Sequence, residues 1–228
     1  MVAVLGLNQN TSMADHSLLL RWLHAGVALG AVYQLVTSLV LLPPDEKGGV
    51  FGHTMMEAHE LGGLLIAAIV ASHFIWSLLV RSEYNPGLSV LVSCKQWKEA
   101  FALIRTLPAG LIGKAKLPSP DNSLAKIVEM LGLLVMVSMA GTGMAIWVGL
   151  PDTSLAVIPE DTDFLMQVHS LLSNLLWVYV IGHVCMTLAH ARGGEPILQR
   201  ISPFYSPPEI SDLSKRKGFI KEENEMTK

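Results

Sequence analysis

Five histidines lie inside long apolar stretches of this 228-residue chain, and they are the residues best able to do chemistry. They are His24, His59, His73, His169 and His183. An ionisable side chain within an apolar helix is costly unless it faces the protein interior and has a partner there. Each of the five is therefore a candidate functional residue.

Four of these histidines form two pairs with the same spacing. His59 and His73 are 14 residues apart, and so are His169 and His183. In an α-helix, 14 residues make nearly four turns, so the members of a pair share one face and lie about 21 Å apart along the axis. The spacing predicts two sites stacked along the same helices.

Neutral imidazoles that face each other inside an apolar helical bundle are what bis-histidine ligation of haem b requires. Zinc or copper needs ligands gathered around one point, and a covalent c-type haem needs a CxxCH motif, which this sequence lacks. The pattern favours two non-covalent haems b. A metal site and structural, unliganded histidines are the alternatives.

Four apolar runs are long enough to carry these histidines across a membrane, because about 20 helical residues span the hydrocarbon core of a bilayer. The runs cover residues 22–42, 61–80, 127–150 and 164–189, and residues 53–60, which contain His59, are expected to form the first turns of the second helix. With 51% hydrophobic and only 15% charged residues, the composition argues against a soluble enzyme. We expect an all-α integral membrane four-helix bundle over residues 16–192, preceded by an N-terminal cap (1–15) and followed by a C-terminal tail (193–228).

The basic residues are distributed very unevenly between the connecting segments. Residues 81–126 hold seven of the 16 Lys and Arg, and residues 192–228 hold another seven, whereas residues 151–163 hold none and four acidic residues instead. Because basic loops stay in the cytoplasm, both termini are expected to be cytoplasmic. His59 and His169 then lie near the outer surface, and His24, His73 and His183 lie at the inner level.

Several other residues invite interpretation. Arg21, one turn before His24, is placed to pair with a haem propionate or else to reach lipid phosphate. Gln34 is expected to make a hydrogen bond between helices, with a proton path or a hydrogen bond to quinone as the alternatives, and Gly143 is expected to form part of a packing face. Residues 95–107 have the pattern of an amphipathic helix, which either lies flat on the inner leaflet or tucks under the bundle. The net charge of −3 argues against a nucleic-acid partner.

Three segments resemble a known family. RWLHAG at His24, HELGG at His59, and HSLLSNLLWVYVIGH from His169 to His183 are similar to the prokaryotic cytochrome b561 family. This family includes the di-haem cytochrome b subunits of formate dehydrogenases (the gamma subunit), Ni-Fe hydrogenases and thiosulfate reductases. The resemblance covers roughly residues 16–192. It implies one haem ligated by His59 and His169 and another by His24 and His183.

His73 departs from the pattern of this family, whose members often have an apolar residue or an arginine at this position. In a bundle like that of cytochrome bc, His73 would pair with His183 instead. We favour His24 as the partner of His183, because Arg21 accompanies it and the family resemblance supports it. His73 is then a neutral neighbour of the inner haem.

The resemblance implies an electron-transfer subunit in the bacterial cytoplasmic membrane. Such a subunit relays electrons between a partner redox protein, such as a dehydrogenase, and the quinone pool, within an oxidoreductase complex. A stand-alone superoxide:quinone oxidoreductase is the first alternative, which the acidic outer segment disfavours because it would repel superoxide. A non-redox metal transporter is the second.

Overall fold

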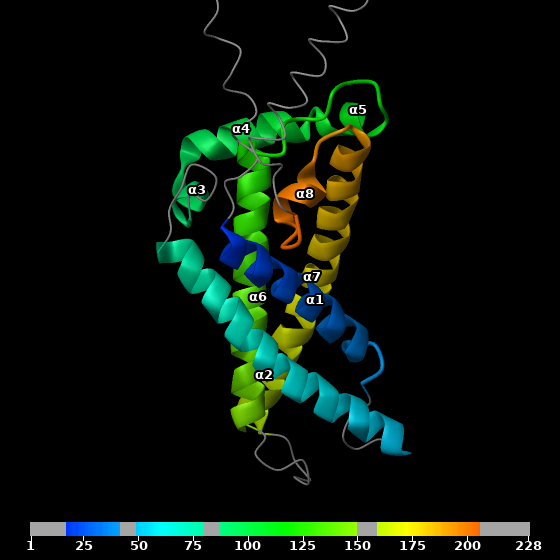
Figure 1. The fold of residues 1–228 in the computed structure, drawn as a ribbon. Helices are drawn as coiled ribbons and strands as arrows, with labels where there is room; N and C mark the ends of the chain where they lie inside the picture. The colour runs from blue at the N-terminus through cyan, green and yellow to red at the C-terminus, as the bar shows by residue number, and fades with distance from the viewer. Residues whose placement is uncertain (1–16, 42–48, 80–86, 150–158, 206–228) are drawn as a thin grey trace, which may run out of the picture.

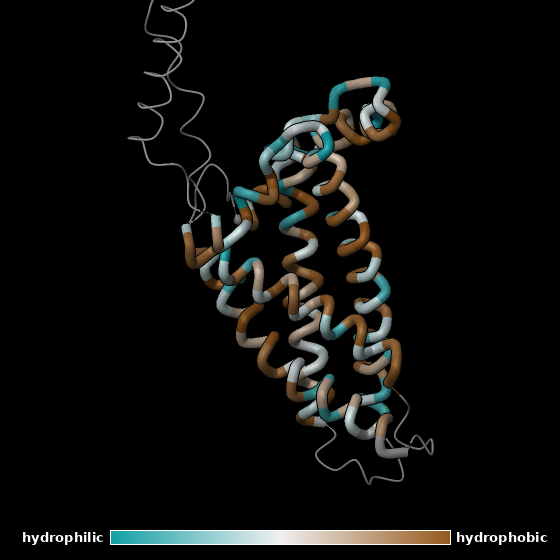
Figure 2. Tube along the Cα trace, turned by 45° about the vertical axis from the view of Figure 1, so that its right-hand side comes forward, coloured by the Kyte–Doolittle hydropathy of each residue, from teal (hydrophilic) through white to brown (hydrophobic). Residues whose placement is uncertain are grey.

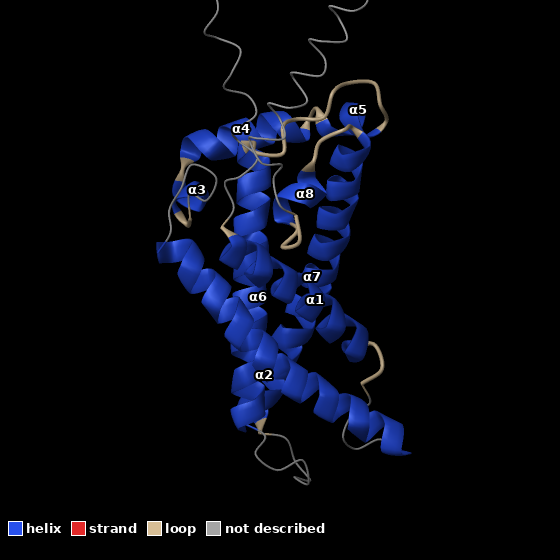
Figure 3. Cartoon of the chain, in the orientation of Figure 1, coloured by secondary structure: helices blue, strands red, loops and turns tan. Residues whose placement is uncertain are grey.

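The computed structural model describes residues 17–41, 49–79, 87–149 and 159–205, all of which form helices and short connections (Figure 1, Figure 3). The long helices are α1 (Leu18–Ser38), α2 (Gly49–Leu79), α6 (Ser123–Gly149) and α7 (Glu160–Arg192). The short ones are α3 (Ser89–Val92), α4 (Cys94–Ile104), α5 (Leu107–Leu111) and α8 (Ile197–Ile201). The described ranges confirm the expected all-α class.

Each long helix is long and apolar enough to cross a membrane. Hydrophobic residues, coloured brown in Figure 2, make up much of the long helices. Leu29, Leu79 and Val178 are each about three-quarters exposed. Since a water-soluble domain seldom exposes a continuous apolar surface of this size, the four helices form a membrane bundle.

Helix α1 begins and ends about four residues earlier than the apolar run predicted. At its start, the side chain of Ser17 accepts a hydrogen bond from the backbone N–H of Leu20 at 3.2 Å and caps the helix. At its end, the hydroxyls of Thr37 and Ser38 bond to carbonyls of the preceding turn. The N–H of Leu39 then bonds three residues back, to Val36, so polar side chains and a tightened turn end the helix.

The most extensive contacts between the long helices are those of α1 with α2, α2 with α6, and α6 with α7. Helices α1 and α2 cross α6 and α7 at an angle (Figure 1). A glycine permits the close approach of α1 to α2, because a Cβ at Gly30 would lie 2.6 Å from Cγ1 of Ile66. The two candidate histidines of α7 face α1 and α2, as described below.

Helix α4 lies across one end of the bundle and packs against α6 (Figure 1); we call this end the α4 end. Ala100 is buried there in a cluster with Val90 and Ile127, and the indole N–H of Trp97 donates to the carbonyl of Leu91 at 2.8 Å. Phe101 and Ile104 stay exposed. The helix is thus amphipathic as predicted. Some of its apolar side chains pack against the bundle, and others are exposed on the outside.

Residues 193–205, which follow α7, fold back onto the α4 end. Nη1 of Arg21 donates to the carbonyls of Tyr205 (3.0 Å) and Ser202 (3.4 Å). The rings of Trp22 and Phe204 meet edge to face with centroids 5.2 Å apart. The first part of the expected tail, residues 193–205, therefore contacts the start of α1.

Candidate functional site

His24 on α1 and His183 on α7 face each other at the α4 end of the bundle. Their ring centroids are 6.3 Å apart and their planes are tilted by 51°. A metal ion held between two imidazoles at bonds of about 2 Å separates the ring centres by about 6 Å. The observed spacing therefore suits a single iron between the two rings.

Tyr179 packs on the same His183 ring. The two rings are stacked with centroids 5.5 Å apart and an angle of 24° between their planes. Gly132 on α6 leaves the room for this arrangement, because a Cβ at that position would overlap the phenol ring. Sequence reasoning missed Tyr179, although its position one turn before His183 was a usable signal.

His59 on α2 and His169 on α7 form a second group, at the other level of the bundle. The two side chains lie near each other. On the continuous helix α7, His169 and His183 are separated by 14 residues, or about 21 Å along the axis. The described structure thus brings the histidines together in two groups, one above the other.

Both histidines of this second group are hydrogen-bonded to a threonine on a neighbouring helix. Oγ1 of Thr37 on α1 lies 3.0 Å from Nδ1 of His59, and Oγ1 of Thr142 on α6 lies 2.8 Å from Nδ1 of His169. Sequence reasoning missed both threonines. No spacing along the chain pointed to them, because each contact joins two different helices.

Further hydrogen bonds hold α1 to α2 around His59. Nε2 of Gln34 donates to the carbonyl of His59 at 3.0 Å, and the hydroxyl of Tyr33 donates to the carbonyl of Ala58 at 3.0 Å. Gln34 therefore makes the hydrogen bond between helices that was predicted for it. These bonds fix the backbone from which the His59 ring projects.

Gly143 on α6 is adjacent to His169. A Cβ at Gly143 would lie 3.2 Å from Cε1 and 3.8 Å from Nδ1 of the His169 ring. The expected packing face thus includes a position that makes room for a candidate ligand. Gly141, two residues earlier, has open space where its Cβ would be.

Two further candidates have buried polar atoms that lack a partner among the described residues: Nδ1 of His73 and Nε of Arg21. The side chain of Arg21 is buried, and its Nη1 donates to the carbonyls of Ser202 and Tyr205. Arg21 therefore lies inside the protein. An arginine that reached lipid phosphate would instead extend to the outside of the bundle. The free Nε suits an acceptor such as a carboxylate.

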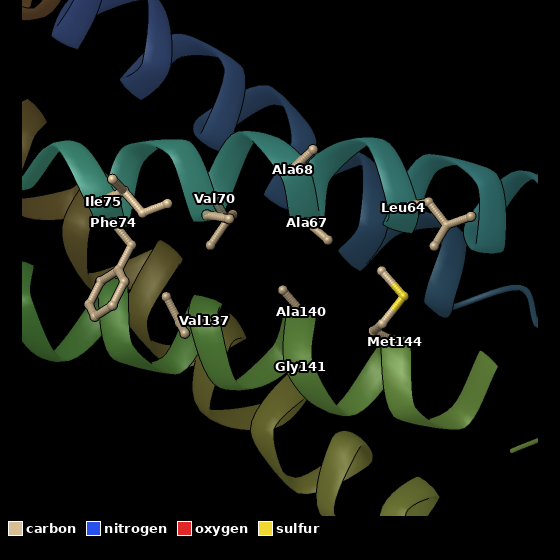
Figure 4. A pocket seen from close by; sticks show the side chains of 11 residues that line it. Leu64, Ala67, Ala68, Val70, Phe74, Ile75, Val137, Ala140, Gly141 and Met144 are labelled. Carbon is tan, nitrogen blue, oxygen red and sulfur yellow. The ribbon is translucent and has the colours of Figure 1, made fainter. Parts of the chain in front are cut away.

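A separate groove of about 500 Å³ lies between α2 and α6 (Figure 4). Ala67 and Phe74 of α2 face Ala140 and Met144 of α6 across it, and Ala71 of α2 also lines it. Ala67 and Ala71 lie roughly 80° and 120° around the axis of α2 from His59. The groove therefore opens on a different face of α2 from the one that carries the histidines. It belongs to the apolar outer surface of the bundle.

The residues of the two histidine groups fit haem b. They offer paired imidazoles from facing helices, an apolar bundle around them, and a buried guanidinium with a free donor for a propionate. A metal cage would instead need three or more close ligands. No such group of His, Cys, Asp or Glu occurs among the residues that the structure describes.

A four-helix membrane bundle with stacked histidine pairs defines the class of membrane cytochromes b. The profile of the prokaryotic cytochrome b561 family matches residues 15–203, so the chain belongs to this family. It is therefore a membrane electron carrier of the di-haem type. Comparisons with curated proteins and with solved structures found no match.

Proposed function

We propose that this cytochrome relays electrons between a partner redox subunit and membrane quinone through two haems b. His59 and His169 ligate one haem, and His24 and His183 ligate the other. The observation that carries the proposal is that each of two histidines on α7 is grouped with a histidine of another helix. In the His24–His183 group, the ring spacing is that of a bis-histidine site.

Haem iron supplies one-electron chemistry by alternating between its ferric and ferrous states. The chain supplies the ligands, holds them on long helices and keeps water away from them. With the histidines of α7 about 21 Å apart, the two sites lie on opposite sides of the membrane interior. Haems held at these two sites would carry electrons across most of the bilayer within this one subunit.

Arg21 binds a propionate of the haem at the His24–His183 site. Its buried Nε is free, and its Nη1 is anchored to the C-terminal segment. His73 lies near the same haem as a neutral neighbour, where its Nδ1 hydrogen-bonds to a propionate or to the quinone. A hydrogen bond of this kind offsets the cost of burying its ring.

The α4 end faces the cytoplasm. Helix α4, its connections and α8 carry Lys95, Lys98, Arg105, Lys116 and Arg200 at this end, whereas α7 begins at the other end with three acidic residues in its first turn. Basic residues accumulate on the cytoplasmic side of membrane proteins. Acidic residues at the opposite end also repel superoxide, which argues against a stand-alone superoxide:quinone oxidoreductase.

Haem content of the purified protein tests the proposal. A pyridine haemochrome assay should find two b-type haems per chain, and acid-acetone should extract both completely. His59→Ala and His169→Ala should each lose one haem and keep the other, because the two sites share no ligand. A single haem in the unmodified protein, a c-type spectrum, or divalent metal in place of haem would contradict the proposal.

A further inference from the structure

Thr37 and Thr142 stand in the same relation to two different histidines. Each hydroxyl lies within hydrogen-bond distance of a histidine Nδ1 on a neighbouring helix, at 3.0 and 2.8 Å. The two contacts are independent, since one joins α1 to α2 and the other joins α6 to α7. Because both histidines of the His59–His169 group make the same contact with a threonine, we infer that the two threonines have the same role.

Each threonine hydroxyl also reaches carbonyls of its own helix. Oγ1 of Thr37 lies 3.0 Å from the carbonyl oxygens of both Tyr33 and Gln34. Oγ1 of Thr142 lies 2.9 and 3.1 Å from those of Ser138 and Met139. A hydroxyl has a single proton to donate, and a carbonyl oxygen can only accept.

The position of that proton sets the state of the histidine. When the hydroxyl donates to a carbonyl of its own helix, as threonines in helices commonly do, its lone pairs remain to accept from Nδ1–H. The ring then carries its proton on Nδ1, and Nε2 has a free lone pair. Nε2 is the nitrogen that can bind iron in this tautomer.

We propose, on the basis of the function proposed above, that Thr37 and Thr142 are positioning residues for the haem at the His59–His169 site. Each accepts a hydrogen bond from Nδ1–H of one ligand and so fixes that ligand's tautomer and ring orientation. The hydrogen bond also makes the imidazole a stronger donor to iron, which favours the ferric state.

Replacing the hydroxyl with a methyl group of the same shape tests this role. Thr37→Val and Thr142→Val remove the acceptor, whereas Thr37→Ser and Thr142→Ser keep it. Ser38→Ala is the matched control, because among the described residues the Ser38 hydroxyl bonds the Leu35 carbonyl of its own helix, at 2.7 Å, and contacts no histidine. The full-length protein is used throughout, and the haem signal that disappears in His59→Ala identifies the site.

The readouts are the midpoint potential of this haem and the electron paramagnetic resonance spectrum of its ferric form. Loss of a hydrogen-bond partner of a metal ligand weakens binding about 10- to 100-fold. A tenfold loss confined to the ferric state corresponds to a rise of about 59 mV for a one-electron couple. Each valine variant should therefore raise the potential and alter the ferric spectrum, and each serine variant should restore both.

The inference is overturned if the valine variants retain two haems with the potential and ferric spectrum of Ser38→Ala. Each threonine is tested by its own variants, so one well-folded valine variant is sufficient to test the inference. Should that variant bind less haem, recovery of full haem content in the serine variant supports the hydrogen bond, and equal loss in both overturns it. An unmodified protein without haem would instead refute the proposed function itself.

Discussion

The imidazole rings of His24 and His183 lie with their centroids 6.3 Å apart, although they belong to the first and last long helices of the bundle. Tyr179 stacks against the side of the His183 ring and holds it in place. His73, by contrast, has a buried Nδ1 without a partner among the described residues. His183 thus has an opposing imidazole, whereas the Nδ1 atom of His73 has no hydrogen-bond partner in the described ranges.

Histidine variants at the α4 end should give different haem contents. His24→Ala should lose one of the two haems, because it removes the ring opposite His183. His73→Ala should keep both and change the potential of one haem or the rate of quinone turnover. Haem content per chain, measured by pyridine haemochrome, checks this. Two haems in His24→Ala together with one in His73→Ala would assign the ligand to His73.

Gly143 gives a second test, at the other site. A Cβ at this position would lie 3.2 Å from Cε1 of His169, which is tighter than ordinary contact, so Gly143→Ala should push the ring by a few tenths of an ångström. The spectrum or potential of the His59–His169 haem should change, while the other haem keeps its values. Gly141→Ala is the control, because its Cβ enters open space. Equal spectra for the two variants would contradict the prediction.

Much of the architecture could be predicted because it is periodic along the chain. The four apolar runs indicated the four long helices, and the 14-residue spacing indicated that His169 and His183 share a face of α7. The ends of α1 could not be read from hydropathy. They depend on the hydroxyls of Ser17, Thr37 and Ser38, whose effect on the backbone is a matter of local geometry.

The surroundings of the histidines were harder to predict, because they come from contacts between helices. Thr37 and Thr142 are 22 and 27 residues from the rings they contact, and the crossing of the helices decides which side chains meet. Gly143 was expected to serve helix packing, as glycines in membrane helices often do. Its contact with His169 depends on the rotation of α6, which the sequence pattern leaves open.

The anchoring of the C-terminal segment predicts a change in stability. Arg21→Met leaves the part-buried carbonyls of Ser202 and Tyr205 without this donor, at a cost of about 1–3 kcal/mol, the magnitude expected for hydrogen bonds that involve a charged group. Residues 193–205 should then be cut faster in limited proteolysis. Arg200→Gln is the control: it breaks an ion pair with the exposed Asp121, and such pairs are worth about 0–1 kcal/mol. Equal cleavage rates in both variants would rule out the anchoring role of Arg21.

The orientation of the bundle can be tested with single cysteines, after the exposed Cys94 and Cys185 are both replaced by serine. Ser119 lies exposed in the connection between α5 and α6 at the basic α4 end, and Glu160 lies exposed at the start of α7 at the other end. Because basic segments resist translocation, Glu160→Cys should react with a membrane-impermeant maleimide in intact cells. Ser119→Cys should react only after the cells are permeabilised. The reverse pattern would place the His59–His169 site, and not the His24–His183 site, next to the cytoplasm, and would reverse the side from which a partner subunit reaches each haem.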